Sequence, residues 1–145
     1  KVETVPAGAK YSRILKLTDG RLHVSGGWAV SQMIEGLTRG VHAFMPTGMH
    51  FTYCRIYNEY MAGNIQTAER LFNELLPVLA FSNQHLDISV HFFKHLLHQQ
   101  GIYATPLVRK PIIGFDIIHR QSAAKLIAKV IALEKQMEES LSLAR

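Results

Sequence analysis

The sequence has very little cysteine: Cys54 is the only one among 145 residues. A single thiol can form neither an internal disulfide nor a cysteine-based zinc cluster, and this sparse use of cysteine suits a reducing compartment. Long apolar runs are also missing, since no stretch approaches the roughly eighteen uninterrupted apolar residues of a membrane-spanning helix. Residues 1–4 lack the apolar run of a secretory signal. These absences predict a soluble, cytoplasmic protein without a membrane partner.

Clusters of basic residues are absent as well, although the formal net charge is +5. The lysines and arginines of the first half of the chain stand singly among apolar residues. Electrostatic binding to phosphates requires clustered positive charge, so we expect no nucleic-acid partner. The 48% hydrophobic and 19% charged content is ordinary for a globular domain that buries a core.

The first part of the chain alternates short apolar runs with segments of helical periodicity, which is typical of repeated βα units. Glycine-containing turns separate the units. The predicted units cover residues 1–17, 22–38 and 41–62, and their strands are the segments 1–3, 22–25 and 41–45.

Beyond residue 62 the alternation stops and the pattern becomes helical. Asn64 is a favourable N-cap for a helix that Pro77 should bend or interrupt. Further helices are predicted over 88–100 and over about twenty residues that include 123–137, where apolar residues recur at three-and-four spacing. The segment 103–114 holds two prolines and ends in glycine, so we expect an extended loop there.

Three parallel strands with their helices do not close a barrel, and an open sheet of this kind leaves an unpaired edge. A complete (β/α)₈ (TIM) barrel takes about 250 residues. We therefore expect an α/β fold that is a partial TIM barrel: its last three βα units over residues 1–62, and a C-terminal helical extension over 63–145. The first five units would lie on a separate chain or segment, in agreement with the missing starting methionine. A small self-standing α/β domain is the alternative.

Several motifs occur in an order and at spacings that are specific when taken together. They are Lys1-Val2-Glu3, Ser25-Gly26-Gly27, Gly40-Val41, Gly63-Asn64 with Ala68, Leu71 and Leu76-Pro77 downstream, and the later Lys94, Gly101-Ile102 and Arg109-Lys110-Pro111. This series resembles the C-terminal half of the dihydrodipicolinate synthase and N-acetylneuraminate lyase family. In that family a lysine followed closely by an acidic residue ends the sixth barrel strand, a glycine-containing turn ends the seventh, and a Gly-Val or Gly-Gly pair begins the eighth.

The resemblance implies a class I aldolase-like lyase in which Lys1 forms a Schiff base with pyruvate or a related 2-keto acid. A deprotonated lysine attacks a ketone to give an imine that withdraws electrons from the neighbouring carbon. Gly26 and Gly27 would let the backbone approach the substrate closely, and Phe44 and Thr47 would complete the substrate site. No cofactor and no metal are implied.

The resemblance also implies partners. The family's proton-relaying tyrosine and carboxylate-binding threonine belong to the N-terminal half of the same barrel, so this chain alone should not complete a turnover. Family members commonly form tetramers, and the apolar seams of the C-terminal helices suit such contacts.

Two departures from the family's pattern bear on the substrate. Trp28-Ala29 stand where sialic-acid-cleaving members have an acidic pair that binds substrate hydroxyls, which argues against a sialic acid substrate. Phe44 replaces a serine and makes the pocket wall more apolar, while Thr47 and Gly48 could supply polar groups at the barrel mouth. Glu3 could tune Lys1, anchor the local loop or form a structural salt bridge.

Two other functions stay open. A non-catalytic binding or interaction module could keep the barrel fold after its site has decayed. A zinc-dependent protein could use His91, His95 and His98, which share one helical face, but such a site needs further ligands. The second substrate and the direction of the reaction do not follow from the sequence.

Overall fold

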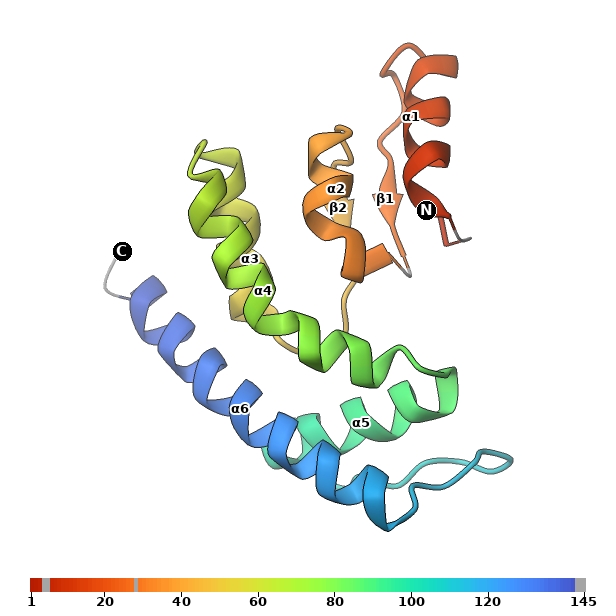
Figure 1. Ribbon diagram of the computed structural model, residues 1–145, viewed down its shortest axis with the longest axis vertical. Helices are drawn as coiled ribbons and strands as arrows, with labels where there is room; N and C mark the ends of the chain where they lie inside the picture. The colour runs from red at the N-terminus through yellow and green to blue at the C-terminus, as the bar shows by residue number, and fades with distance from the viewer. Residues whose placement is uncertain (4–5, 28, 143–145) are drawn as a thin grey trace. The chain divides into compact units, whose positions relative to one another are not determined.

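The computed structural model describes residues 1–3, 6–27 and 29–142, so Trp28 lies outside the described residues. The elements in chain order are α1 (Ala7–Leu17), β1 (Ser25–Gly26), the 3₁₀-helix η1 (Ala29–Gln32), α2 (Met33–Thr38), β2 (Ala43–Phe44), α3 (His50–Met61), α4 (Ile65–Ser82), α5 (Leu86–Gln99) and α6 (Ile117–Ser142) (Figure 1). They form two compact units, Lys1–Pro46 with Ile56–Phe72 and Thr47–Arg55 with Asn73–Arg145. No helix in the described part of the chain is long and apolar enough to cross a membrane.

Three parallel extended segments form the sheet of the first unit. The N–H of Val2 donates to the carbonyl of Ser25 at 2.9 Å, and the N–H of Gly27 donates to the carbonyl of Val2 at 3.0 Å. Val2 is thereby bridged to Gly26, which is itself paired in parallel with Phe44 of β2. The predicted order of three parallel segments, with α1 and α2 in the connections between them, is confirmed.

The strands are shorter than the sequence indicates, and β1 begins at the last residue of its predicted strand. Gly26 was expected in a turn, but it belongs to β1 and pairs with a neighbour on each side. Strand limits follow the register of both neighbours, which an apolar run does not encode.

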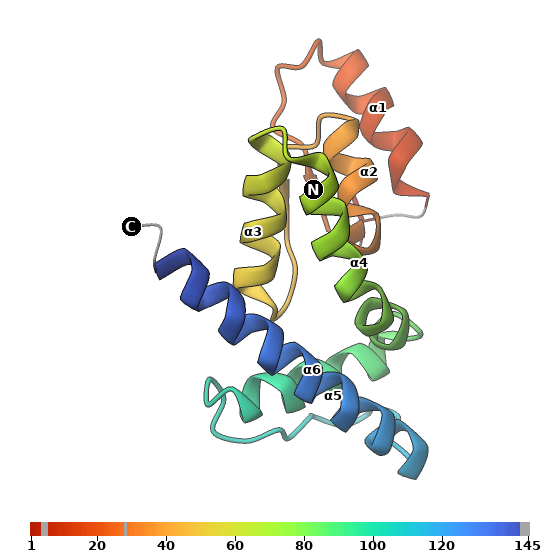
Figure 2. The same cartoon turned by 60° about the vertical axis from the view of Figure 1, so that its left-hand side comes forward.

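One face of these segments is covered by α1, which lies beside α2 (Figure 2). Tyr11 of α1 is fully buried, and the core around it consists of Ala7, Val24 and Val41, with Val2, Ile14, Leu15 and Phe44 packed against it. The apolar face predicted for residues 11–17 is therefore only partly buried, because Leu17 is 73% exposed.

The helices of the second unit largely follow the predicted pattern. The connection between α5 and α6 contains neither helix nor strand, as predicted for 103–114. Pro77 does not interrupt α4, which continues to Ser82. A proline inside a helix costs about 3 kcal/mol, and the buried Leu75, Val78 and Leu79 around it offset that cost by packing.

Within the second unit, a buried carboxylate joins α6 to the start of α3. Glu134 of α6 is only 5% exposed and accepts hydrogen bonds from the N–H groups of Phe51, at 3.1 Å, and Thr52, at 2.9 Å, and from the Thr52 hydroxyl. Phe51 and Thr52 lie in the first turn of α3, and this turn contains no acidic residue. Glu134 therefore caps α3 and complements the positive end of its dipole. Burial, and then the Glu134 charge, raise the pKa of the neighbouring Tyr53, which stays neutral.

Replacing the carboxylate should destabilise the second unit. We expect Glu134→Gln to lower the free energy of unfolding by about 1–3 kcal/mol, because the amide cannot satisfy both backbone donors as well as a carboxylate does. Urea denaturation would measure the loss, with Glu139→Gln on the exposed side of α6 as the matched control. Equal stabilities of the two variants would contradict the capping role of Glu134.

Histidine rings surround the buried Phe115 in the same unit. The ring of Phe115 lies 5.1 Å from that of His91, 6.1 Å from that of His95 and 5.5 Å from that of His119, with the last two stacked. These contacts connect α5, the segment before α6 and the first turn of α6. Neutral imidazole packs on an apolar ring at lower desolvation cost than imidazolium does.

Acidification should weaken this packing. Burial lowers the pKa of His95 from its ordinary value near 6.5, and the charges of His91, His98 and Arg120 lower it further. The unfolded chain therefore gains a proton at this position before the folded chain does. The contribution of neutral His95 to the free energy of unfolding is therefore fully present above about pH 6.5, and it decreases as the pH drops below that value. Urea denaturation between pH 8 and pH 5 should show a weaker pH dependence for His95→Gln than for the exposed control His50→Gln, and identical pH dependence would exclude His95 as the cause.

Candidate functional site

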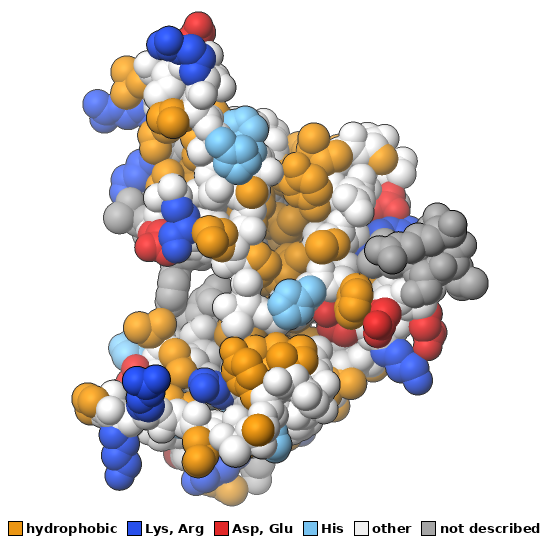
Figure 3. Space-filling view, turned by 180° about the vertical axis from the view of Figure 1, so that it is seen from behind, with side chains coloured by type: hydrophobic (Ala, Val, Ile, Leu, Met, Phe, Trp, Pro, Cys, Tyr) orange, Lys and Arg blue, Asp and Glu red, His pale blue; other side chains and the backbone are white. Residues whose placement is uncertain are grey.

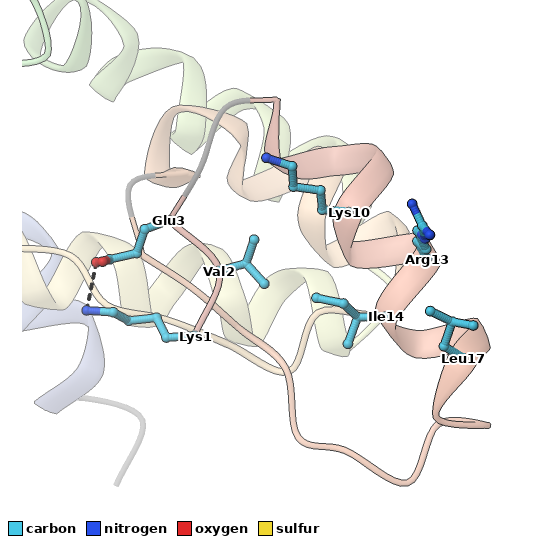
Figure 4. Close-up of a pocket in the computed structure, with 7 residues that line it drawn as sticks. All are labelled: Lys1, Val2, Glu3, Lys10, Arg13, Ile14 and Leu17. Carbon is cyan, nitrogen blue, oxygen red and sulfur yellow. Dashed lines mark ion pairs between the residues drawn. The ribbon is translucent and has the colours of Figure 1, made fainter.

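The first extended segment sends its side chains to opposite faces of the sheet. Successive side chains alternate along an extended chain, and Val2 packs into the core beneath α1. Lys1 and Glu3 therefore project from the other face. Figure 4 shows both side chains pointing away from α1 and towards one another, whereas Val2 points towards Ile14.

The amine of Lys1 is paired with a carboxylate. Its Nζ lies 2.8 Å from Oε1 of Glu3, and the two side chains are 42% and 59% exposed. An ion pair this exposed contributes little to stability. Its significance is geometric, because it fixes where the amine lies on this face.

The two predicted site glycines lie against different faces of the sheet. A Cβ on Gly27 would come within 2.5 Å of Cγ and 2.8 Å of Oε1 of Glu3. A Cβ on Gly26 would instead meet the hydroxyl of Tyr11 at 2.7 Å and the ring of Phe44 at 2.8 Å. Gly27 thus belongs to the face of Lys1, where Glu3 fills the space beside it, and Gly26 belongs to the helix-covered face.

Phe44 lies on the face opposite Lys1. It is level with Gly26 in the parallel register, and its ring also approaches Gly36 of α2, where an added Cβ would meet it at 2.6 Å. Its ring packs between the strands and α2, on the opposite side of the strands from the lysine. The sequence predicted Phe44 in a pocket wall beside the lysine, but the register of the strands decides which face a residue occupies, and a local sequence pattern does not specify that register.

Register also brings in residues that sequence reasoning did not select. Ser25 and Ala43 are paired with each other and precede Gly26 and Phe44, so alternation places them on the face of Lys1. Thr47 is exposed and belongs to the second compact unit, whereas Lys1, Glu3 and Gly27 belong to the first. The structure therefore groups Lys1, Glu3, Gly27, Ser25 and Ala43.

A cavity of about 450 Å³ lies beside the first segment and α1. It is lined by Lys1, Val2, Glu3, Lys10, Arg13, Ile14 and Leu17 (Figure 4). Val2 directs its N–H and carbonyl towards β1, so the segment turns its other edge away from the sheet. Hydrophobic side chains are visible elsewhere on the surface as well (Figure 3).

The three helical histidines pack as structural side chains. His95 stacks on Phe115, the ring of His91 is tilted against it, and Nδ1 of His98 lies 2.9 Å from the carbonyl of Tyr103. Among the described residues, no group of three or more His, Cys, Asp or Glu side chains is arranged to hold a metal ion. The zinc hypothesis gains no support from this arrangement.

Known structures share this fold. No protein-family model matches the chain, and no curated protein matches it significantly. The chain is similar to dihydrodipicolinate synthase from Rhodopseudomonas palustris, with a TM-score of 0.78 and 20% identity over 89% of this chain and 44% of that one. It is also similar to a protein of Pseudomonas aeruginosa assigned as a dihydrodipicolinate synthetase, with a TM-score of 0.71 and 18% identity over 88% of this chain and 43% of that one.

The chain has a dihydrodipicolinate synthase-like fold. It spans less than half the length of either solved structure, and its parallel segments and helices are consistent with part of a TIM barrel. At 18–20% identity the likeness shows the fold alone.

The placement of Phe44 can be tested by its effect on stability. We expect Phe44→Ala to lower the free energy of unfolding by about 2 kcal/mol, because the truncation leaves a gap between the strands and α2. Met45→Ala, at the next position and 59% exposed, should change it by less than about 0.5 kcal/mol. Urea denaturation compares the two variants, and a loss at Met45 as large as at Phe44 would reverse the assignment of faces.

Proposed function

We propose that this chain carries the Schiff-base lysine of a lyase, aldolase or dehydratase that acts on pyruvate or a related 2-keto acid. Lys1 is the nucleophile. The observation that supports this role most strongly is that Lys1 projects from the face of the parallel segments that α1 does not cover. In a closed barrel that face is the interior, and active sites lie at the carboxyl ends of its strands.

The chemistry follows from the amine. Once it has lost its proton, Nζ attacks the ketone carbon and forms an imine, whose protonated form draws electrons from the adjacent carbon. The resulting enamine can add to an aldehyde, release one, or expel a hydroxyl group. The same lysine therefore serves a synthase, a lyase or a dehydratase, and the groups contributed by the rest of the barrel select among them.

The proposal includes the rest of the barrel. Residues 1–62 would form its last three βα units and 63–145 its C-terminal helices, while an N-terminal half would supply the preceding strands. The outward edge of the first segment suits such pairing, because an unpaired strand edge accepts another strand. Assembly into a tetramer, and a cytoplasmic location in keeping with the single cysteine, belong to the same proposal.

A non-catalytic binding module is the second candidate, and one observation favours it. The Lys1 amine is already paired with the Glu3 carboxylate at 2.8 Å. An ammonium group in an ion pair has no lone pair with which to attack a ketone. In a decayed site that pair would simply be a surface salt bridge, and Lys1 would never bind a substrate covalently.

Reduction with borohydride in the presence of pyruvate separates the two functions. In a preparation that contains the N-terminal half of the barrel, we expect a reduced pyruvate adduct, placed by peptide mapping on the side chain of Lys1. Lys1→Arg should abolish the adduct, because guanidinium keeps the charge but is not a nucleophile at neutral pH. Lys10→Arg, in the same cavity, should retain it. An unmodified Lys1 in the complete barrel would rule out the lyase and favour the binding module.

A further inference from the structure

Glu3 lies beside the Lys1 amine and Gly27 lies beside Glu3, and the proposed function as stated gives neither residue a chemical role. Oε1 of Glu3 is 2.8 Å from Nζ, the atom that would react. The carboxylate is two residues from Lys1 along an extended segment, so both side chains occupy one face. Hydrogen bonds from Val2 to Ser25 and from Gly27 to Val2 hold that segment in place.

The position of the Glu3 side chain explains why residue 27 is a glycine. Gly27 is not among the glycines with positive φ, so its backbone does not require glycine. The three nearest atoms that an added Cβ would meet are Cγ, Oε1 and Cδ of Glu3, at 2.5, 2.8 and 3.1 Å. An alanine at position 27 would therefore displace the Glu3 side chain from its position beside Lys1.

We propose that Glu3 is the acid–base group for imine formation at Lys1, and that Gly27 leaves the space in which Glu3 works. This inference rests on the proposed Schiff-base function. The carboxylate touches the reacting nitrogen directly and comes from the same strand as the lysine. It is distinct from any group that the rest of the barrel would supply.

Imine formation needs no proton donor or acceptor other than Glu3. The Glu3 carboxylate takes one proton from the Lys1 ammonium, and the free amine adds to the ketone carbon of the 2-keto acid, which gives a carbinolamine after a proton moves from nitrogen to oxygen. The protonated Glu3 then returns its proton to the carbinolamine hydroxyl, which leaves as water while the nitrogen lone pair forms the C=N bond. The products are the iminium ion, water and the Glu3 carboxylate.

The ion pair in the structure is the starting state of this sequence. The contact between Nζ of Lys1 and Oε1 of Glu3 places the proton acceptor at hydrogen-bond distance from the amine. General acid–base groups positioned in this way accelerate reactions by about 10²–10⁴-fold. The partial exposure of both side chains lets the carboxylate exchange partners as the nitrogen changes from ammonium to imine.

The rate of borohydride-trapped adduct formation at saturating pyruvate tests the role of Glu3, in a preparation that contains the N-terminal half of the barrel. Glu3→Gln and Glu3→Ala should each slow adduct formation by about 100-fold, while the exposed control Glu69→Gln should react like the unmodified protein. Added formate should restore much of the rate to Glu3→Ala, because the space beside Gly27 is then open. It should not restore Glu3→Gln, in which the amide fills that space.

The role of Gly27 is tested by combining substitutions at Gly27 and Glu3. Gly27→Ala alone should slow trapping about as much as Glu3→Ala does, yet it should cause no further loss in the Glu3→Ala background. Additive losses would show that Gly27 acts independently of Glu3 and would overturn its assigned role. Trapping at the unmodified rate in Glu3→Gln, or a Glu3→Ala variant that formate does not restore, would overturn the acid–base role.

The two proposals fail in different ways. If the unmodified protein gives no adduct on Lys1, the Schiff-base function itself is wrong, and the role of Glu3 is wrong with it. If the adduct forms on Lys1 at a rate that does not depend on Glu3, the function stands and this inference is wrong. Urea denaturation of each variant verifies that the substitutions leave the fold intact.

Discussion

The register of three parallel segments is the constraint on which the candidate site depends. Val2, Gly26 and Phe44 are level with one another, and Val2 and Phe44 pack on the helix-covered side. Because side chains alternate along each segment, a slip of one residue would turn Val2 outward and bury the Lys1 charge. The burial of apolar side chains on one face thus fixes the position of the lysine on the other.

The second unit is organised by a different interaction. Its helices bury apolar faces, but the start of α3 also requires an acceptor for its free N–H groups, and Glu134 provides it from more than eighty residues away. A buried carboxylate is tolerated there because three donors surround it. The first unit therefore depends on strand register, and the second on helix packing with one satisfied buried charge.

Strand register and helix packing can both be preserved between proteins that share a fold at only 18–20% identity. Register and helix packing need apolar side chains of suitable volume at alternating positions, and many sequences meet that requirement. The proposed chemistry has narrower needs, since only an amine forms the imine and only a nearby acid–base group exchanges its proton. The proposed function accordingly depends on Lys1, Glu3 and Gly27, and the shared fold alone does not specify it.

The sequence by itself determined the parallel order of the segments, the helical second half and the extended stretch at 103–114, because these follow from local periodicity and from glycine and proline. It also drew attention to Lys1 and Gly27 through a resemblance. Only the tertiary structure decided that Phe44 faces the helices, that Glu3 occupies the space beside Gly27 and that Glu134 caps α3. These features depend on register and on contacts between distant residues, which no local pattern specifies.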